Sequence, residues 1–365
     1  MEIEIKDKRK ELLEVIHKKI KEGGNIYIYG ASTTAQMIRD YLADKGIETE
    51  SSFVVDDRYY KEGDSSSIPL SRFHDIAKPH DALICGFASY KRYCELAGDE
   101  KKLGKTDFFF FPFPYSMNTE RCYIDGAFFQ DYRSGFERTY GHLEDEESKD
   151  LMRVFLEAQI CGELDRLQAK HSKLQYFDIP MPQEFDIFID GGGYIGDTME
   201  AAFANLNRIS EYYMFEPDPE HQIKIQKAID NVSSGKVYWI KKGLWKEETV
   251  LHFSSEDSAS RLDDSGDIEV EVTSVDISVK TKRGQTVYLK LDIEGSEVPA
   301  LIGATEMIRF NRPYMAICVY HKRDDLIIIP DLIDEISEEG YKYYLRYYGD
   351  NFRELVLYCI PKEKC

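Results

Sequence analysis

The stretch FIDGGGYIGDT, residues 188–198, combines glycines and carboxylates in a spacing that suits a nucleotide ligand. Gly191, Gly193 and Gly196 have the G-x-G-x-x-G spacing that lets a backbone loop approach a ligand closely. Asp190 precedes these glycines, and Asp197 follows them. The flanking residues predict a strand before the loop and a helix after it, which is the context that such a loop requires.

Glu216 lies 20 residues beyond Gly196, at the end of the next predicted strand. A carboxylate there can accept hydrogen bonds from both ribose hydroxyls of an adenosine-type ligand. Asp190 and Asp197 would repel the pyrophosphate of a dinucleotide, but they would attract the amino group of S-adenosylmethionine (SAM). The loop therefore favours SAM as the cofactor, although Asp197 is equally suited to capping the helix.

Asp292 and Glu294 lie at the end of the predicted strand VYLKLDI, and His321 follows the predicted strand PYMAICVY. The carboxyl ends of neighbouring parallel strands meet at one edge of a sheet, so these three are candidate catalytic residues. His321 could be the general base of a methyl transfer and contact the substrate, because its ordinary pKa of about 6.5 suits proton abstraction. Alternatively, the three residues could hold a Mg²⁺ ion that acidifies an acceptor hydroxyl. Magnesium prefers oxygen ligands, which favours the metal-free arrangement.

Four further residues are candidates for ligand contacts. Leu244 and Trp245 follow the third strand of this region, where an adenine ring would lie. The polar segment 254–267 predicts a mobile loop over the acceptor site, and its Arg261 could bind a phosphate or carboxylate. Arg346 lies in the tyrosine-rich strand YLRYYGD, which suits either sugar stacking or core packing.

Alternating strands and helices over residues 184–365 predict the domain that positions these candidates. At its end, YKYYLRYY and RELVLYCI are joined by GDNF, which predicts an antiparallel hairpin at the sheet edge. Residues 1–115 predict a smaller parallel α/β domain, because NIYIYGASTTAQMIRDYLADKGIETESSFVVDD reads as strand, glycine turn, helix and strand. Residues 116–183 are acidic, and their apolar residues recur at helical spacing, which predicts a helical connector between the two domains. The fold class is therefore α/β, with two sheets.

Six motifs occur in order over residues 185–361: FIDGGGYIGDT, YMFEPDPE, KKGLWKEETVLHF, VTSVDI, VYLKLDIEGSEVPALIGA and PYMAICVYHKRDDLIIIP. On these motifs the sequence resembles the FkbM-type methyltransferases, SAM-dependent enzymes that methylate oxygens on sugars and natural products. The resemblance implies a Rossmann-like, seven-stranded sheet whose last strand runs antiparallel. Such proteins often carry an acidic residue in the strand before the histidine. This chain has Cys318 and Val319 there, so a proton-accepting role at that position is in doubt.

Residues 1–115 are similar to the nucleotide-sugar-handling Rossmann-like domains attached to sugar acyltransferases, although GASTTA (30–35) keeps a single glycine. This domain could bind a nucleotide sugar, or it could serve as a scaffold or in dimerisation. The extra domain and the connector are consistent with a homodimer.

The chain has 47 basic and 67 acidic residues and a net charge of −20, which disfavours nucleic acid and anionic membranes as partners. No apolar run approaches the ~20 residues that span a membrane, so we expect a cytoplasmic protein. Its seven cysteines are scattered, which predicts reduced thiols. The leading hypothesis is a SAM-dependent O-methyltransferase acting on a sugar or nucleotide-linked sugar. The alternatives are an NAD-dependent oxidoreductase and a non-catalytic nucleotide-sugar-binding protein.

Overall fold

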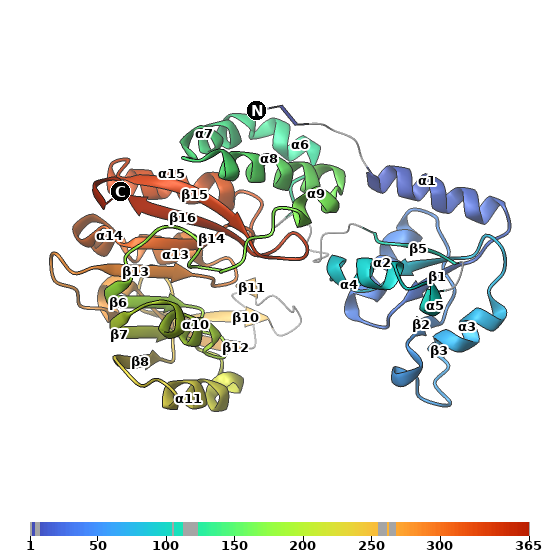
Figure 1. Cartoon of the computed structure of the whole chain (residues 1–365), viewed down its shortest axis with the longest axis horizontal. Helices are drawn as coiled ribbons and strands as arrows, with labels where there is room; N and C mark the ends of the chain where they lie inside the picture. Colours follow the sequence, from blue (N-terminus) through green and yellow to red (C-terminus); the bar gives the residue numbers. More distant parts are fainter. Residues whose placement is uncertain are drawn as a thin grey trace.

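The computed structural model describes residues 2–3, 8–103, 106–111, 123–254, 261–262 and 268–364 of the 365-residue chain. It contains a five-stranded sheet, a seven-stranded sheet and a small four-stranded sheet (Figure 1). The predicted α/β class is confirmed. None of the described helices is long and apolar enough to cross a membrane.

The first sheet is entirely parallel and has the strand order β3-β2-β1-β4-β5. Its strands are β1 (Ile26–Tyr29), β2 (Phe53–Val55), β3 (Ser67–Pro69), β4 (Ala82–Cys85) and β5 (Asp107–Phe109). The accompanying helices are α1 (Lys8–Lys21), α2 (Thr33–Asp44), η1 (Asp57–Tyr59), α3 (Leu70–Ile76), α4 (Tyr90–Ala97) and α5 (Glu100–Leu103). Strands β1 and β4 are buried along their whole length, as expected for a sheet covered on both faces.

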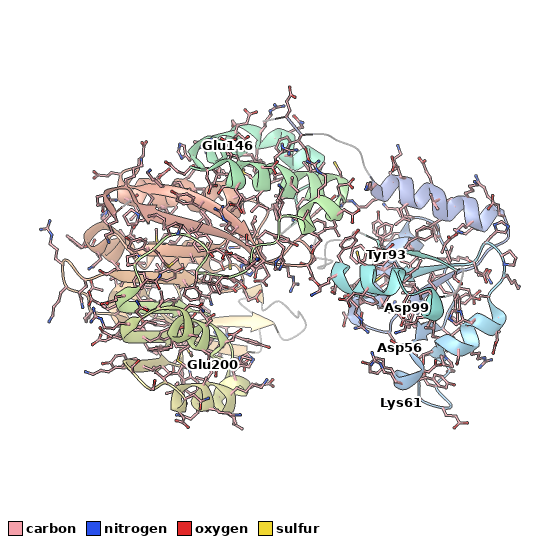
Figure 2. The ribbon with its side chains drawn as sticks, viewed as in Figure 1. Asp56, Lys61, Tyr93, Asp99, Glu146 and Glu200 are labelled. Carbon is pink, nitrogen blue, oxygen red and sulfur yellow. The ribbon has the colours of Figure 1, made fainter. Side chains whose placement is uncertain are left out.

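Four helices separate the two larger sheets. They are α6 (Gly126–Asp131), α7 (Arg133–His142), α8 (Glu146–Cys161) and α9 (Leu164–Gln168). Helix α8 is capped by Gly162, whose φ of 79° is a left-handed conformation that glycine adopts without strain. The helices lie against the β15–β16 side of the seven-stranded sheet (Figure 1). Acidic side chains such as Glu146 on α8 and Glu200 on α10 lie on the outer surface, in keeping with the negative net charge (Figure 2).

The seven-stranded sheet has the order β15-β16-β14-β13-β6-β7-β8. Its strands are β6 (Glu184–Gly191), β7 (Arg208–Phe215), β8 (Lys236–Ile240), β13 (Val287–Leu291), β14 (Tyr314–Cys318), β15 (Tyr341–Tyr347) and β16 (Leu355–Pro361). Strand β16 is antiparallel to both of its neighbours, whereas β6, β7, β8, β13 and β14 are parallel. The predicted terminal hairpin and antiparallel last strand are confirmed.

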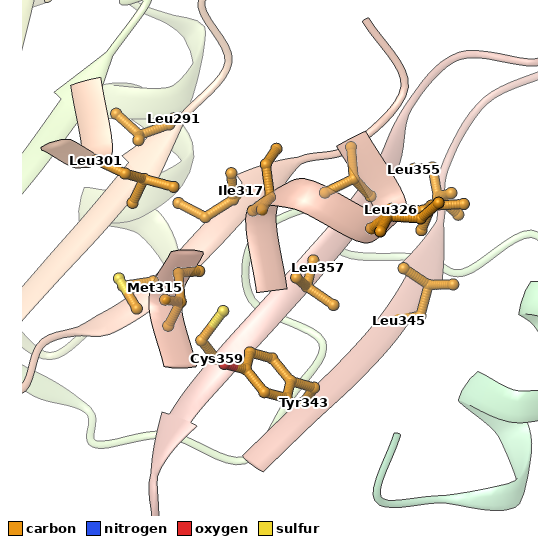
Figure 3. Close-up of a cluster of buried hydrophobic side chains, with 14 of the residues drawn as sticks. Leu291, Leu301, Met315, Ile317, Leu326, Tyr343, Leu345, Leu355, Leu357 and Cys359 are labelled. Atoms are coloured by element: carbon orange, nitrogen blue, oxygen red, sulfur yellow. The ribbon is translucent and has the colours of Figure 1, made fainter. Parts of the chain in front are cut away.

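Helices cover this sheet: α10 (Asp197–Asn205), η2 (Pro219–His221), α11 (Gln222–Asp230), α12 (Val275–Ser278), α13 (Glu297–Ile302), α14 (Thr305–Asn311), α15 (Asp325–Ser337) and η3 (Lys362–Lys364). On one face, side chains of β13, β14, β15, β16, α13 and α15 form a continuous apolar core (Figure 3). Within it, Leu291, Ile317 and Leu357 are fully buried on three consecutive strands. This packing fixes the strand ends at which polar residues gather.

A small sheet with the order β11-β10-β12-β9 was not predicted. It consists of β9 (Gly243–Leu244), β10 (Thr249–Ser254), β11 (Arg261–Leu262) and β12 (Ile268–Thr273). The segment 254–267, which was expected to be a loop, therefore contains part of this sheet. Residues 255–260 and 263–267 lie outside the described part of the chain.

Candidate functional site

The carboxyl ends of three neighbouring strands bring the predicted loop and the predicted catalytic residues together. Leu291 at the end of β13 pairs with Gly191 on β6 and with Ile317 on β14. The backbone N–H of Asp292 donates to the carbonyl oxygen of Gly191 at 3.1 Å. The glycine loop and Asp292 are thus hydrogen-bonded to one another, at the edge where parallel α/β sheets bind ligands.

Each glycine of the loop is enclosed by protein atoms. A methyl group on Gly192, which has a φ of 79°, would lie 1.9 Å from the carbonyl oxygen of Asp292. On Gly193 it would lie 2.3 Å from Met214, and on Gly196 2.8 Å from Ala228. Gly192 is outside the G-x-G-x-x-G spacing and was not predicted, yet it has the closest approach and joins the loop to Asp292.

Asp190 lies beneath the loop and has no exposed surface. Its carboxylate is 3.0 Å from the ammonium of Lys290 and accepts a hydrogen bond from Tyr212 at 2.7 Å. Lys290 also donates to the carbonyl oxygens of Gly191 and Gly192, at 3.1 and 2.7 Å. Burial raises the pKa of Asp190. Burial lowers the pKa of Lys290, but the charges of Asp190 and Asp292 and the hydrogen bond to Asp190 together more than offset this effect and raise the pKa. Asp190 therefore holds Lys290 in place, and Lys290 holds the loop.

Asp197 and Glu216 are placed differently from Asp190. Asp197 is exposed at the first position of α10, where its carboxylate accepts from the backbone N–H of Thr198 at 3.0 Å. Glu216, just after β7, accepts from the backbone N–H groups of Tyr194 and Asp218 at 2.8 and 2.9 Å. Burial raises the pKa of Glu216. The structure thus brings Glu216 into contact with the glycine loop through Tyr194.

The pair Leu244–Trp245 follows β8 along the chain but joins the small sheet. Leu244 is buried, and its side chain abuts Gly191, where an added methyl group would lie 2.9 Å from it. The backbone N–H of Trp245 donates to Thr273 on β12, and the residue is half-buried. Leu244 therefore borders the glycine loop directly.

Asp292, Glu294 and His321 meet around the imidazole ring. The His321 Nε2 atom lies 3.5 Å from Asp292 Oδ1 and 3.6 Å from Glu294 Oε2, and the His321 side chain is 6% exposed. Burial alone would lower the pKa of His321, but the charges of Glu297, Asp292 and Glu294 and the direct contact with Glu297 together outweigh burial and raise the pKa to about 10. The ring is consequently an imidazolium at neutral pH, which has no lone pair to accept a proton.

Two carboxylates that were not predicted face the other side of His321. Glu297, at the start of α13, places Oε1 2.9 Å from His321 Nδ1 and is 1% exposed. Asp325, at the start of α15, is also buried, and burial raises its pKa to about 7. Glu297 belongs to the motif LKLDIEGSE and Asp325 to YHKRDD, so proximity to the predicted residues was the available signal.

Two tyrosines hold Asp292. Tyr176, from the segment before β6, donates to Oδ2 at 2.9 Å, and Tyr320 donates to Oδ1 at 3.3 Å. Burial would raise the pKa of Asp292, but Lys290, His321 and the Tyr176 hydrogen bond hold it below its ordinary value. The Tyr320 hydroxyl also lies 3.4 Å from Glu354, in the turn between β15 and β16. Nothing in the spacing of the sequence indicated Tyr176, Tyr320 or Glu354.

Arg346, one of the two predicted arginines, does not join this group. Arg346 is buried against α8, where it contacts Asp145 at 2.7 Å and Ser148 at 2.9 Å. These contacts hold the β15–β16 hairpin against helix α8. Arg261 lies on β11, and its side chain is outside the described part of the structure.

Strand order, the antiparallel last strand and the glycine loop make the second sheet a Rossmann-like sheet with a reversed last strand. Residues 190–343 match the family model of the methyltransferase FkbM domain, which confirms the resemblance for that part of the chain. The crystal structure of methyltransferase FkbM from Methylobacillus flagellatus KT has a similar fold. Its TM-score is 0.72 at 20% sequence identity, and the match covers 95% of this chain and 92% of that chain. A search of curated proteins finds no significant match.

Proposed function

We propose that this protein is a SAM-dependent O-methyltransferase whose acceptor is a sugar or nucleotide-linked sugar. The observation that carries the proposal is the contact between the glycine loop and Asp292, since it joins a nucleotide-binding element to a buried polar cluster. Glu216 suits the ribose hydroxyls, and exposed Asp197 suits the ammonium of the cofactor's methionine half.

The same residues argue against a dinucleotide. Asp197 lies at the mouth of α10, where a pyrophosphate would otherwise bind. Lys290 is engaged by Asp190 and by the loop carbonyl oxygens, so it offers no charge to a phosphate. The NAD-dependent alternative is therefore the weaker one.

Asp292 is the proton acceptor in the proposed reaction. SAM, when bound, supplies an electrophilic methyl group to an acceptor oxygen. Asp292 is ionised at neutral pH, and Tyr176 and Tyr320 orient its carboxylate. Burial raises the pKa of both tyrosines, so they remain protonated donors. Asp292 can then receive the acceptor's proton as the new carbon–oxygen bond forms; positive charge at His321 keeps the carboxylate ionised until that transfer.

A cavity of about 450 Å³ beside this cluster supports a polyhydroxylated acceptor. Its walls include Lys91 of α4, His171 after α9, and Asp350 and Glu354 of the β15–β16 turn. Carboxylates can accept hydrogen bonds from sugar hydroxyls, and the Lys91 ammonium and an imidazole N–H of His171 can donate to the hydroxyl oxygens. Glu354 shares the Tyr320 hydroxyl with Asp292, which connects the cavity to the proposed proton acceptor.

Calorimetric titration with SAM and with NAD tests the cofactor. We expect SAM binding that Glu216→Ala abolishes, whereas Glu220→Ala, an exposed carboxylate in the same turn, leaves it unchanged. Tight NAD binding without SAM binding would overturn the proposal. Release of S-adenosylhomocysteine in the presence of nucleotide sugars, compared with reactions lacking acceptor, tests the sugar assignment separately.

A further inference from the structure

Buried ligand-type atoms converge on the far side of His321 from Asp292. Glu297, His321 and Asp325 each offer one ligand atom, and these atoms lie within 4.8 Å of one another. All three side chains are almost entirely buried. In the part of the chain that the structure describes, this is the group of three residues that meets metal-ligand spacing.

Several atoms of this group lack a hydrogen bond. Glu297 Oε2 and both ring nitrogens of His321 are buried without a hydrogen-bond partner. His321 Nδ1 touches Glu297 Oε1 at 2.9 Å as an ion pair, but the two atoms are not aligned as a hydrogen bond. Buried polar atoms are normally satisfied, and a bound ion is one cause of apparent exceptions.

Backbone groups fix both carboxylates. Glu297 Oε1 accepts from the N–H groups of Ile293 and Gly295, at 3.0 and 3.4 Å. Asp325 Oδ2 accepts from the N–H of Lys322 at 2.7 Å. One oxygen of each carboxylate is thereby held by the chain, as outer-shell hydrogen bonds hold ligands in metal sites.

We propose that Glu297, His321 and Asp325 bind a divalent transition-metal ion, Mn²⁺ or Zn²⁺. An imidazole with two carboxylates suits these ions, whereas Mg²⁺ and Ca²⁺ prefer oxygen ligands alone. His321 supplies at most one positive charge against the two carboxylates, but a divalent ion neutralises both. Ligation through Nδ1 would replace the proton on that nitrogen by the ion, so the ion would supply the positive charge and the ring would keep its proton on Nε2, on the side of Asp292 and Glu294. The ion would therefore position His321 beside the proposed proton acceptor.

Titration of the EDTA-treated full chain with MnCl₂ and ZnCl₂ tests the site, with MgCl₂ and CaCl₂ for comparison. We expect one Mn²⁺ or Zn²⁺ ion per chain and binding at least 10-fold weaker in Glu297→Gln and in Asp325→Asn. Glu294→Gln is the matched control, because its carboxylate faces His321 from the exposed side and is 68% exposed. Loss of binding in that control alone would place the ion elsewhere and overturn the proposal. So would an absence of binding, or binding that survives both buried substitutions.

A second measurement remains decisive if the buried variants do not fold. X-ray absorption at the zinc edge of the loaded native chain should show one imidazole and otherwise oxygen ligands. Sulfur ligands would indicate capture by a cysteine, and an oxygen-only shell would indicate surface carboxylates. Either result would overturn the proposal, and neither depends on whether SAM is the cofactor.

Discussion

Replacing Lys290 by Met should destabilise the second sheet strongly, because it leaves Asp190 as an unpaired buried charge. The two side chains are 2% and 0% exposed and 3.0 Å apart. Coulomb's law at an effective dielectric constant of about 20 gives about 5 kcal/mol for two unit charges at this separation. The unpaired carboxylate can instead take up a proton, which costs about 4 kcal/mol at pH 7 for an ordinary pKa near 3.9. We therefore expect Lys290→Met to lower the free energy of unfolding by about 3–4 kcal/mol at pH 7.

The pH dependence of this effect follows from its cause. In the variant, the pKa of Asp190 would be higher in the folded state than in the unfolded state. The stability of the variant therefore falls as the pH rises from the unfolded pKa to the folded pKa. The loss should therefore shrink to about 1.5 kcal/mol at pH 5. Urea unfolding followed by tryptophan fluorescence suits the measurement, because the chain's two tryptophans, Trp239 and Trp245, both belong to the second half of the chain.

Two further variants separate the buried charge from general damage. Asp190→Asn combined with Lys290→Met removes both charges, and we expect it to recover most of the loss. Lys342→Met is the matched surface control: its ammonium is 2.9 Å from Glu144, but the two side chains are 32% and 42% exposed. That control should cost less than about 1 kcal/mol. A loss below 1 kcal/mol in Lys290→Met, or an equal loss at pH 5 and pH 7, would refute the reasoning.

Two other predictions concern the loop and the connector. Gly192→Ala should abolish SAM binding in calorimetry, because the added methyl group would overlap the carbonyl oxygen of Asp292. Gly284 has a similar positive φ and open surroundings, so Gly284→Ala should lower the free energy of unfolding by about 1 kcal/mol and leave SAM binding intact. Equal effects of the two substitutions would contradict this account. Asp145→Asn should lower stability by about 1–2 kcal/mol at pH 7, since Arg346 and Ser148 outweigh burial and hold the pKa of Asp145 below its usual value. The contribution of Asp145 to stability is complete above pH ~4 and is lost as the pH falls through its folded pKa. The urea midpoints of the native protein and Asp145→Asn should therefore converge in acid. A difference that stays constant with pH would count against the ion pair.

The sequence predicted the strand ends well because hydrophobic periodicity and strand adjacency are local signals. Asp292 and His321 were expected to meet because parallel strands end at the same edge of the sheet. In the structure, His321 Nε2 lies 3.5 Å from Asp292 Oδ1. The small sheet was not predicted, since β9 and β11 have only two residues each and gain their pairing from β12 and β10. Strands this short carry no periodicity to detect.

The direction of a side chain was harder to predict than its position in the chain. Asp190 and Asp197 flank the same loop, yet one is fully buried beneath it and the other is exposed. The difference depends on Lys290, which comes from a strand about 100 residues later and neutralises the buried carboxylate. Likewise, His321 was considered with an ordinary pKa, whereas Glu297 changes its charge state through a contact that spacing does not reveal.

The concentration of negative charge around His321 constrains the acceptor. Carboxylates from three segments act on this ring or on one another: Asp292, Glu294 and Glu297 from residues 292–297, Asp325 and Glu354. An anionic group beside the reacting hydroxyl would be repelled by them. If the acceptor is a nucleotide-linked sugar, its diphosphate must therefore bind away from Asp292. In the cavity wall, Lys91 from the first sheet's helix α4 is a cation placed to receive it. Replacing Lys91 by Ala should then weaken the binding of nucleotide sugars more than the binding of free sugars. That result would show that the first domain contributes to acceptor choice.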